Sequence, residues 1–342
     1  MLQLSIRSGF ALSTIVGLVC ATHLGAQEVP RCEVIPEIGK ASFCIDGVKK
    51  TCWVFGASAG YPRPFFYPLH GPSGQTLTRM GHPGAPDHDH HQSVWFAHHD
   101  VEGESFWANG KGTTIRQKQW LAYEDGDDAA QMACLIGWFG EDGNELLEQE
   151  LVVAMLPAEK GQYELEIQST FKPGAGRETT QLGKTNFGFL AVRVAKSVAE
   201  HFGGGRLTDS EVRETEKNIF GKQAKWMDYS GLVYSHSKST GKRVATPEGI
   251  TFMEHPDNLS YPTQWHVRAD GWMGASPGME QAIAVTKEKP LQLRYSLFVH
   301  SGACDQDLIN TRHEAFSKRP AFEVIASPEP HIRHAIRRAG SQ

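Results

Sequence analysis

The chain has 342 residues, of which 40% are hydrophobic, and its formal net charge is −5. The apolar residues suffice for a large core, and 35 glycines and 18 prolines indicate many turns. Nothing in the charge pattern resembles the Lys/Arg runs that contact a phosphate backbone, so nucleic acid is excluded as an expected partner.

The first 26 residues have the order of features that export requires. Arg7 precedes an apolar stretch over residues 10–20, and the small residues Gly25 and Ala26 follow. This order is typical of a secretory signal peptide cleaved after Ala26. No later segment reaches the length of about eighteen apolar residues that a spanning helix needs. We therefore expect a periplasmic or extracellular protein with no membrane insertion after signal removal.

Five cysteines follow the expected signal peptide, and three of them crowd its end: Cys32, Cys44 and Cys52. In an oxidising compartment a disulfide among these three is one interpretation. Burial of the cysteines as small core residues is the other. The spacing of the three cysteines does not decide between these two interpretations.

Apolar and polar residues alternate with a period of two over most of the remaining chain. Tyr163, Leu165 and Ile167 alternate with glutamates, and residues 291–299 repeat the pattern. Shorter runs of this kind cover residues 120–123, 135–139, 151–155 and 249–253. The pattern predicts an all-β fold, a large antiparallel β-sandwich forming one domain over residues 27–325. A short helix is expected near the C-terminus, at residues 307–316, and a loose tail over residues 326–342.

The segment from residue 82 to residue 100 carries the densest set of reactive groups. It holds six of the 16 histidines, and no Lys or Arg occurs from residue 80 to residue 110, although five acids do. Imidazoles and carboxylates without a nearby cation favour a metal ion. They equally suit proton transfer near neutral pH, or turn capping with no chemical role.

The spacing within this histidine loop gives a specific hypothesis. In an extended chain His88 and His90 share a face, with His91 opposite. The apolar run at residues 94–97 predicts a strand that brings His98 back to the same place. His88, His90 and His98 are therefore the candidate ligands for a divalent transition metal.

A second polar group of residues lies at 254–268. The alternation from Trp265 onwards predicts a strand on which His266 and Arg268 share a face, where they can donate protons and bind hydroxyl-rich or anionic ligands. We expect this segment, including His255, to meet the histidine loop at one pocket. Tryptophans and phenylalanines lie beside both groups of residues, as in sites where a sugar ring stacks on an indole, although most such residues in a sandwich belong to the core.

Several ordered motifs resemble a known family. They are YPRPFFYP at 61–68, DHDHHQSVWFAH at 87–98, DYSG at 228–231, HPDN at 255–258, WHVR at 265–268 and LRY at 293–295. Over residues 61–302 the chain resembles a family of exported bacterial proteins of unknown function that is often labelled "methane oxygenase PmoA". Gln92 and Ser93 depart from the family pattern. A methane oxygenase subunit has several membrane spans, which this sequence lacks after its first 26 residues. The resemblance instead implies a β-sandwich similar to those of sugar epimerases and polysaccharide lyases, with a carbohydrate substrate.

The leading hypothesis is an exported carbohydrate-active enzyme, a hydrolase or lyase that uses histidine acid/base chemistry with or without a metal ion. The candidate catalytic residues are His90, His98, His255 and His266. The candidate substrate-binding residues are Arg63, Arg193, Asp228, Asn258, Trp265 and Arg268. Two alternatives stay open: a non-catalytic carbohydrate-binding or cell-surface protein, and a secreted metal-binding or oxidative protein that holds copper or iron.

Overall fold

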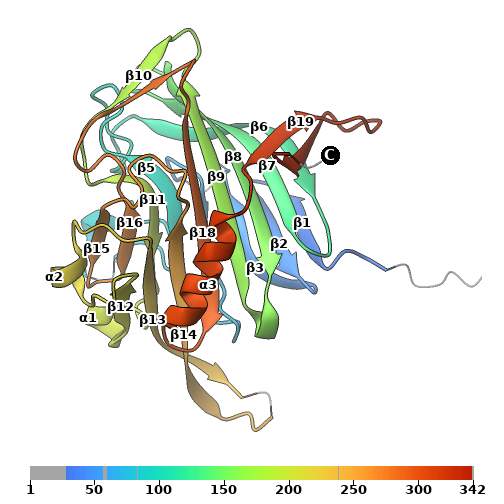
Figure 1. Cartoon of the computed structure of the whole chain (residues 1–342), viewed down its shortest axis with the longest axis vertical. Helices are drawn as coiled ribbons and strands as arrows, with labels where there is room; N and C mark the ends of the chain where they lie inside the picture. The colour runs from blue at the N-terminus through green and yellow to red at the C-terminus, as the bar shows by residue number, and fades with distance from the viewer. Residues whose placement is uncertain (1–27, 57–59, 83, 238, 341–342) are drawn as a thin grey trace, which may run out of the picture.

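The computed structural model describes residues 28–340, apart from residues 57–59, 83 and 238 (Figure 1). The expected signal peptide, residues 1–26, lies outside the described residues. Within the described part, no helix is long and apolar enough to cross a membrane.

Two eight-stranded antiparallel sheets form the body of the protein. The first sheet has the order β1 (Cys32–Glu37), β2 (Lys40–Ile45), β3 (Val48–Val54), β4 (Phe65–Phe66), β5 (Val94–His98), β11 (Gly188–Arg193), β16 (Trp272–Ala275) and β15 (Trp265–Arg268). The second has the order β12 (Arg206–Asp209), β13 (Trp226–His236), β14 (Arg243–Glu254), β18 (Leu291–Ser301), β9 (Tyr163–Pro173), β8 (Glu145–Pro157), β7 (Ala130–Phe139) and β6 (Thr114–Glu124). The predicted antiparallel sandwich is confirmed.

Smaller elements surround the sheets. Two small antiparallel sheets pair β10 (Thr179–Leu182) with the distant β17 (Ile283–Thr286), and β19 (Phe322–Ala326) with β20 (His334–Arg338), the latter pair forming a hairpin. The helices are α1 (Glu200–Gly203), α2 (Glu216–Ile219) and α3 (Gln306–Ser317), with 3₁₀ turns at Pro86–His88 and Glu159–Gly161. The long helix α3 matches the segment predicted at 307–316, and the Asp305 side chain caps it by accepting the N–H of Leu308 at 3.1 Å.

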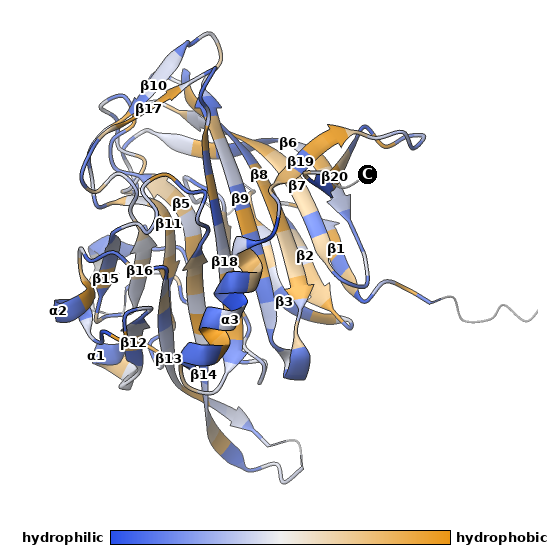
Figure 2. Cartoon of the chain, viewed as in Figure 1, coloured by the Kyte–Doolittle hydropathy of each residue, from blue (hydrophilic) through white to orange (hydrophobic). Residues whose placement is uncertain are grey.

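The core lies between the two sheets, because each strand turns alternate side chains inward. Trp53 and Val192 of the first sheet share one apolar cluster with Ile167 and Phe252 of the second. The alternating hydrophobic and hydrophilic bands along the strands are visible in Figure 2. Every strand predicted from period-two alternation is present, since such alternation is what burying one sheet face demands.

The C-terminal residues do not form the expected loose tail. β20 pairs with β19 from Ala326↔His334 to Phe322↔Arg338. The Arg338 guanidinium donates to both oxygens of Glu166, at 2.6 and 2.7 Å, and Glu166 is almost fully buried on β9. Arg338 therefore neutralises a glutamate of the second sheet, a partnership between residues about 170 positions apart that composition does not reveal.

The described cysteines are all free thiols, four of them buried: Cys32, Cys44, Cys52 and Cys134. Of the two interpretations of the N-terminal group, the structure therefore favours cysteines that fill core positions.

Candidate functional site

The candidate site lies on the face of the first sheet that points away from the core. Along β16, Met273 belongs to the main core, whereas Trp272 belongs to a separate outer cluster with Trp95 and Ala191. The same alternation puts Arg193 of β11 on this outer face, since its neighbour Val192 is in the core.

A pocket of about 190 Å³ opens on this outer face. Three histidines of the loop, His88, His90 and His91, line it together with His266 and Arg268 of β15. The other lining residues are Trp107, Phe187, Arg193, Asp270 and Trp272. The structure thus joins the histidine loop to the 265–268 strand, as the sequence led us to expect, but without His255.

Arg193 and Asp270 form the charged floor of the pocket. Arg193 is 1% exposed, and its Nη1 donates to Asp270 Oδ1 at 2.6 Å. The other carboxylate oxygen, Oδ2, contacts Nε2 of His82 at 2.6 Å. Burial alone would raise the pKa of Asp270, but the hydrogen bond and charge of Arg193, followed by those of His82, lower it to about 2. The Nε and Nη2 atoms of Arg193 are buried without a partner among the described residues.

His266 presents a defined tautomer. Its Nδ1 lies 3.0 Å from the carbonyl oxygen of Asn186. A carbonyl can only accept, so Nδ1 carries the proton and Nε2 keeps a lone pair. Burial, reinforced by the Arg268 charge, lowers the pKa of His266 to about 4. The ring is therefore a neutral proton acceptor at physiological pH.

The loop histidines form a compact group of imidazoles. Ring centroids are 4.4 Å apart for His90 and His91, 5.1 Å for His88 and His91, and 5.4 Å for His82 and His88. Burial lowers the pKa of His90 to about 4 and that of His91 still further. The expectation that His91 points away from His88 and His90 is wrong. The Pro86–His88 segment is a 3₁₀ turn rather than extended chain, so alternation does not apply there.

Aromatic rings form the remaining wall. Trp107 and Trp272 lie with centroids 5.2 Å apart, and Phe187 packs on Trp107 at 5.2 Å and on His266 at 4.9 Å. The Nε1 donor of Trp272 is buried and has no partner among the described residues. A buried indole N–H usually finds an acceptor, so this donor is available to a ligand.

Arg63 does not line the pocket. It is 4% exposed and donates to the carbonyl of His90 at 3.2 Å and to those of Phe106 and Trp107 at 3.0 and 2.9 Å. The guanidinium thereby ties the histidine loop to the segment that carries Trp107. Arg63 is a positioning residue, and the structure does not support the predicted direct contact with substrate.

The structure does not assemble the predicted metal ligands. His98 is on β5, where its ring packs on Phe189 at 4.9 Å on the core side, while Trp95, three residues earlier, faces the outer cluster. An odd number of residues along a strand puts two side chains on opposite faces. Hence His98 is separated from His88 and His90. In the described part of the chain, no three His, Cys, Asp or Glu side chains are arranged to hold a metal ion.

Three further predicted residues belong to the interior of the protein. His255 contacts Arg294 at 3.0 Å and packs on Phe316 of α3, on the outer side of the second sheet. Asn258 donates to the Arg294 carbonyl at 2.9 Å, and Trp265 is fully buried with its Nε1 donating to the Ala224 carbonyl at 2.8 Å. All three stabilise loops and core and lie outside the pocket.

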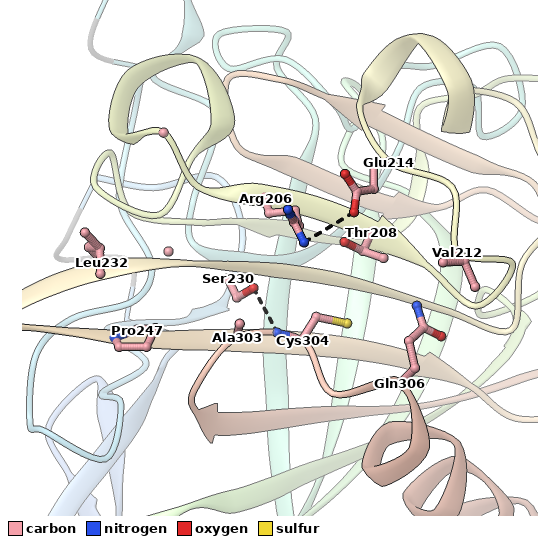
Figure 3. A pocket seen from close by; sticks show the side chains of 12 residues that line it. Arg206, Thr208, Val212, Glu214, Ser230, Leu232, Pro247, Ala303, Cys304 and Gln306 are labelled. Atoms are coloured by element: carbon pink, nitrogen blue, oxygen red, sulfur yellow. Dashed lines mark hydrogen bonds and ion pairs between the residues drawn. The ribbon is translucent and has the colours of Figure 1, made fainter.

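Asp228 also lies elsewhere, buried in the second sheet. Its Oδ2 accepts from Thr251 at 2.7 Å and contacts His300 Nε2 at 2.8 Å, an interaction that spans β13, β14 and β18. Close by, a cavity of about 280 Å³ is lined by Ser230 and Cys304, with Arg206 and Glu214 paired at 3.4 Å (Figure 3). None of the predicted site residues lines this cavity, and burial raises the pKa of Cys304, so its thiol is a poor nucleophile.

Sequence reasoning missed Asp270, and it overlooked His82 as its partner. Asp270 stands in the Asp-Gly turn between β15 and β16, where an aspartate is the ordinary choice for a turn. A usable signal was its position two residues after Arg268, at the end of a strand whose outer face was already expected to carry the site.

The fold and the pocket define the chain as an antiparallel β-sandwich protein with a histidine- and arginine-lined pocket on the outer face of one sheet. The model of DUF6807, a family of unknown function, matches residues 40–314. The chain belongs to this family, in agreement with the resemblance drawn from its motifs. No curated protein matches the chain.

Proposed function

We propose that the pocket is the active site of an exported carbohydrate-processing enzyme, a hydrolase or lyase in which His266 is the general base. The observation that carries the proposal is the Nδ1 contact of His266 with Asn186, because it leaves the Nε2 lone pair of a neutral imidazole free to take a proton. Arg193, with two nitrogens that lack a partner among the described residues, supplies donors in the same pocket.

The charge balance of the pocket supports a neutral, hydroxyl-bearing ligand. Arg193 is paired with Asp270, and Arg268 with Glu216 at 3.0 Å, so both guanidinium groups keep donors without leaving a large net positive charge. The imidazoles of His90 and His266 are uncharged above about pH 5, because burial lowers the pKa of each to about 4. Hydroxyl groups both donate and accept, which suits this mixture of bases and donors.

The aromatic wall supports a sugar ring. Trp107, Trp272 and Phe187 offer apolar surfaces for C–H groups, while the Trp272 indole N–H is available for a hydroxyl oxygen. The chemical step follows from these groups. In a hydrolase, His266 Nε2 takes a proton from the water whose oxygen bonds to the anomeric carbon, the glycosidic C–O bond breaks, and Arg193 stabilises the departing oxygen until it takes up a proton from solvent. In a lyase, His266 Nε2 takes a proton from the ring carbon next to the one that bears the leaving oxygen, the electron pair forms the C=C bond of the unsaturated product, and the departing oxygen is stabilised and protonated in the same way.

The test is turnover of an oligosaccharide panel by the purified mature chain, with products separated by chromatography. Ultraviolet absorbance of an unsaturated product distinguishes a lyase from a hydrolase. His266→Ala should lower kcat by roughly 10²–10⁴-fold, as loss of a general base does. His334→Ala, in the C-terminal hairpin, is the matched control and should retain full activity. Saturable sugar binding without turnover would instead support the non-catalytic binding protein.

A metal-binding function is the second candidate. The rings of His82, His88, His90 and His91 lie close together, although no three of them are arranged to hold a metal ion in the described structure, so binding would require their side chains to rotate. The lowered pKa values of His82, His90 and His91 keep these three imidazoles neutral, the form that binds metal. Calorimetric titration of the wild type and His91→Ala with Zn²⁺ and Cu²⁺ tests it. Saturable binding lost in the variant supports a metal site, and equal binding in both rejects it.

A further inference from the structure

A second cavity, of about 350 Å³, is unusually basic. It lies between the start of β3, the turn at residues 70–74 and the end of β13. Four of its lining residues have basic side chains: Lys49, Lys50, His70 and His236. None of its lining residues is acidic.

Lys50 is the central feature of this basic cavity, because it is 7% exposed and yet forms no ion pair with any residue that the structure describes. Its Nζ donates to the carbonyl of Gly161 at 3.3 Å and lies 5.8 Å from the ring centroid of Tyr163. Burial lowers its pKa, while the more distant charges of Asp46 and Glu248 act in the opposite direction. Lysines are almost never buried unless paired, and a bound anion would supply the partner that Lys50 lacks among the described residues.

Two other polar atoms near Lys50 also lack a partner. His70 Nδ1 and Ser73 Oγ are buried without a hydrogen bond among the described residues. The backbone N–H of Ser73 donates to Glu248 Oε1 at 2.7 Å, so the turn engages one oxygen of that buried carboxylate, while Oε2 lies beside Gly71 without a partner among the described residues. The charges of Lys49 and Lys50 add to burial in lowering the pKa of His70, which shows how closely the basic groups gather.

We propose that the basic cavity binds a tetrahedral oxyanion, the sulfate or phosphate group of a small ligand. Donors come from three separate chain segments around one buried ammonium, an arrangement that suits oxygens pointing in several directions. Among the described residues no arginine lines the cavity, so the ligand would be held by the point charge of a lysine, which is a common way to bind phosphate, rather than by the arginine fork. The volume is about ten times the roughly 30 Å³ share of one water, so a group carrying the oxyanion also fits.

Isothermal titration calorimetry tests the proposal at constant ionic strength, with inorganic sulfate, inorganic phosphate, glucose 6-sulfate and glucose 6-phosphate as ligands. Lys50→Met removes the ammonium and keeps the length of the side chain. The wild type should bind one oxyanion saturably, and Lys50→Met should bind it roughly tenfold to a hundredfold more weakly, the loss expected for a hydrogen bond to a charged group. Lys172→Met, an exposed lysine of β9, is the matched control and should bind like the wild type.

The same titrations distinguish a free oxyanion from one carried on a sugar. Tighter binding of the glucose esters than of the free ions assigns the cavity to a sugar-borne group, and equal affinity assigns it to the free ion. The absence of saturable binding for all four ligands overturns the proposal, as does undiminished affinity in Lys50→Met.

Urea denaturation in the absence of the anion shows whether each variant still folds. Lys50→Met should be at least as stable as the wild type, because it removes an unpaired buried charge. His236→Ala provides a second variant at an exposed position of the same cavity, and its affinity should fall several-fold with no change in stability. Unchanged affinity in both variants would reject the site irrespective of how either one folds.

Discussion

Replacing Asp270 by asparagine tests the charged floor of the candidate site. The amide keeps the volume of the side chain and one acceptor oxygen, but it removes the charge that Arg193 and His82 contact at 2.6 Å. Arg193 is 1% exposed and already has two nitrogens without a partner, so it cannot recover the lost interaction from solvent.

Two magnitudes bound the free energy of unfolding that Asp270→Asn should lose. The pKa of Asp270 falls from 3.8 to about 2, which corresponds to about 2.5 kcal/mol of stabilisation of the charged form. Breaking a buried ion pair from one side costs about 3–5 kcal/mol, because the remaining charge is left unpaired. We expect Asp270→Asn to lower the free energy of unfolding by about 2–4 kcal/mol, measured by urea denaturation followed by tryptophan fluorescence.

Two controls make this prediction specific. Adding Arg193→Met to Asp270→Asn should restore at least about 1 kcal/mol, since the uncompensated charge is then gone. The pKa of Asp270 is lower in the folded state than in the unfolded state. The stabilisation by its charge is therefore present above about pH 4 and is lost as pH falls toward 2. A cost below about 1 kcal/mol, or a double variant whose losses simply add, would refute the reasoning.

If His266 is the base, the acid limb of kcat/KM should lie near pH 4, where its imidazole protonates, and a limb near 6.5 would point to another group. Burial by itself would lower the pKa of His300, but the contact with Asp228 raises it. His300→Gln should therefore cost most stability at about pH 6 and progressively less at more alkaline pH. A pH-independent loss of stability in urea denaturation would contradict this prediction. Gly174→Ala should cost about 1–3 kcal/mol or more, because its Cβ would lie 2.0 Å from the Glu145 carbonyl oxygen, whereas Gly278→Ala, with no contact closer than 3.6 Å, should leave the melting temperature nearly unchanged.

Residues with a strong local pattern were predicted correctly. The strand at Trp265–Arg268 has the predicted bounds, and His266 and Arg268 share its outer face as expected. Alternation is a local property of the chain, because one buried sheet face requires every second side chain to be apolar. The helix α3 was recognised on similarly local grounds.

Predictions that depended on the side of a sheet on which a side chain lies were less successful. His98 was grouped with His88 and His90 because all three are close in sequence, yet the strand β5 turns His98 to the core. His255 and His266 are only eleven positions apart, but a loop sends one to the second sheet and the other to the first. Proximity in sequence does not fix the side of a sheet on which a group lies.

The sequence by itself determined the all-β architecture, the strand positions and the family, because periodicity and ordered motifs are carried by neighbouring residues. Only the tertiary structure decided the site. It paired Arg193 with Asp270 of a distant turn, placed Arg338 on Glu166, and left Lys50 buried with no ion pair among the described residues. Charges acquire their roles from desolvation and from partners tens to hundreds of residues away, and both arise only when the two sheets and their loops have packed.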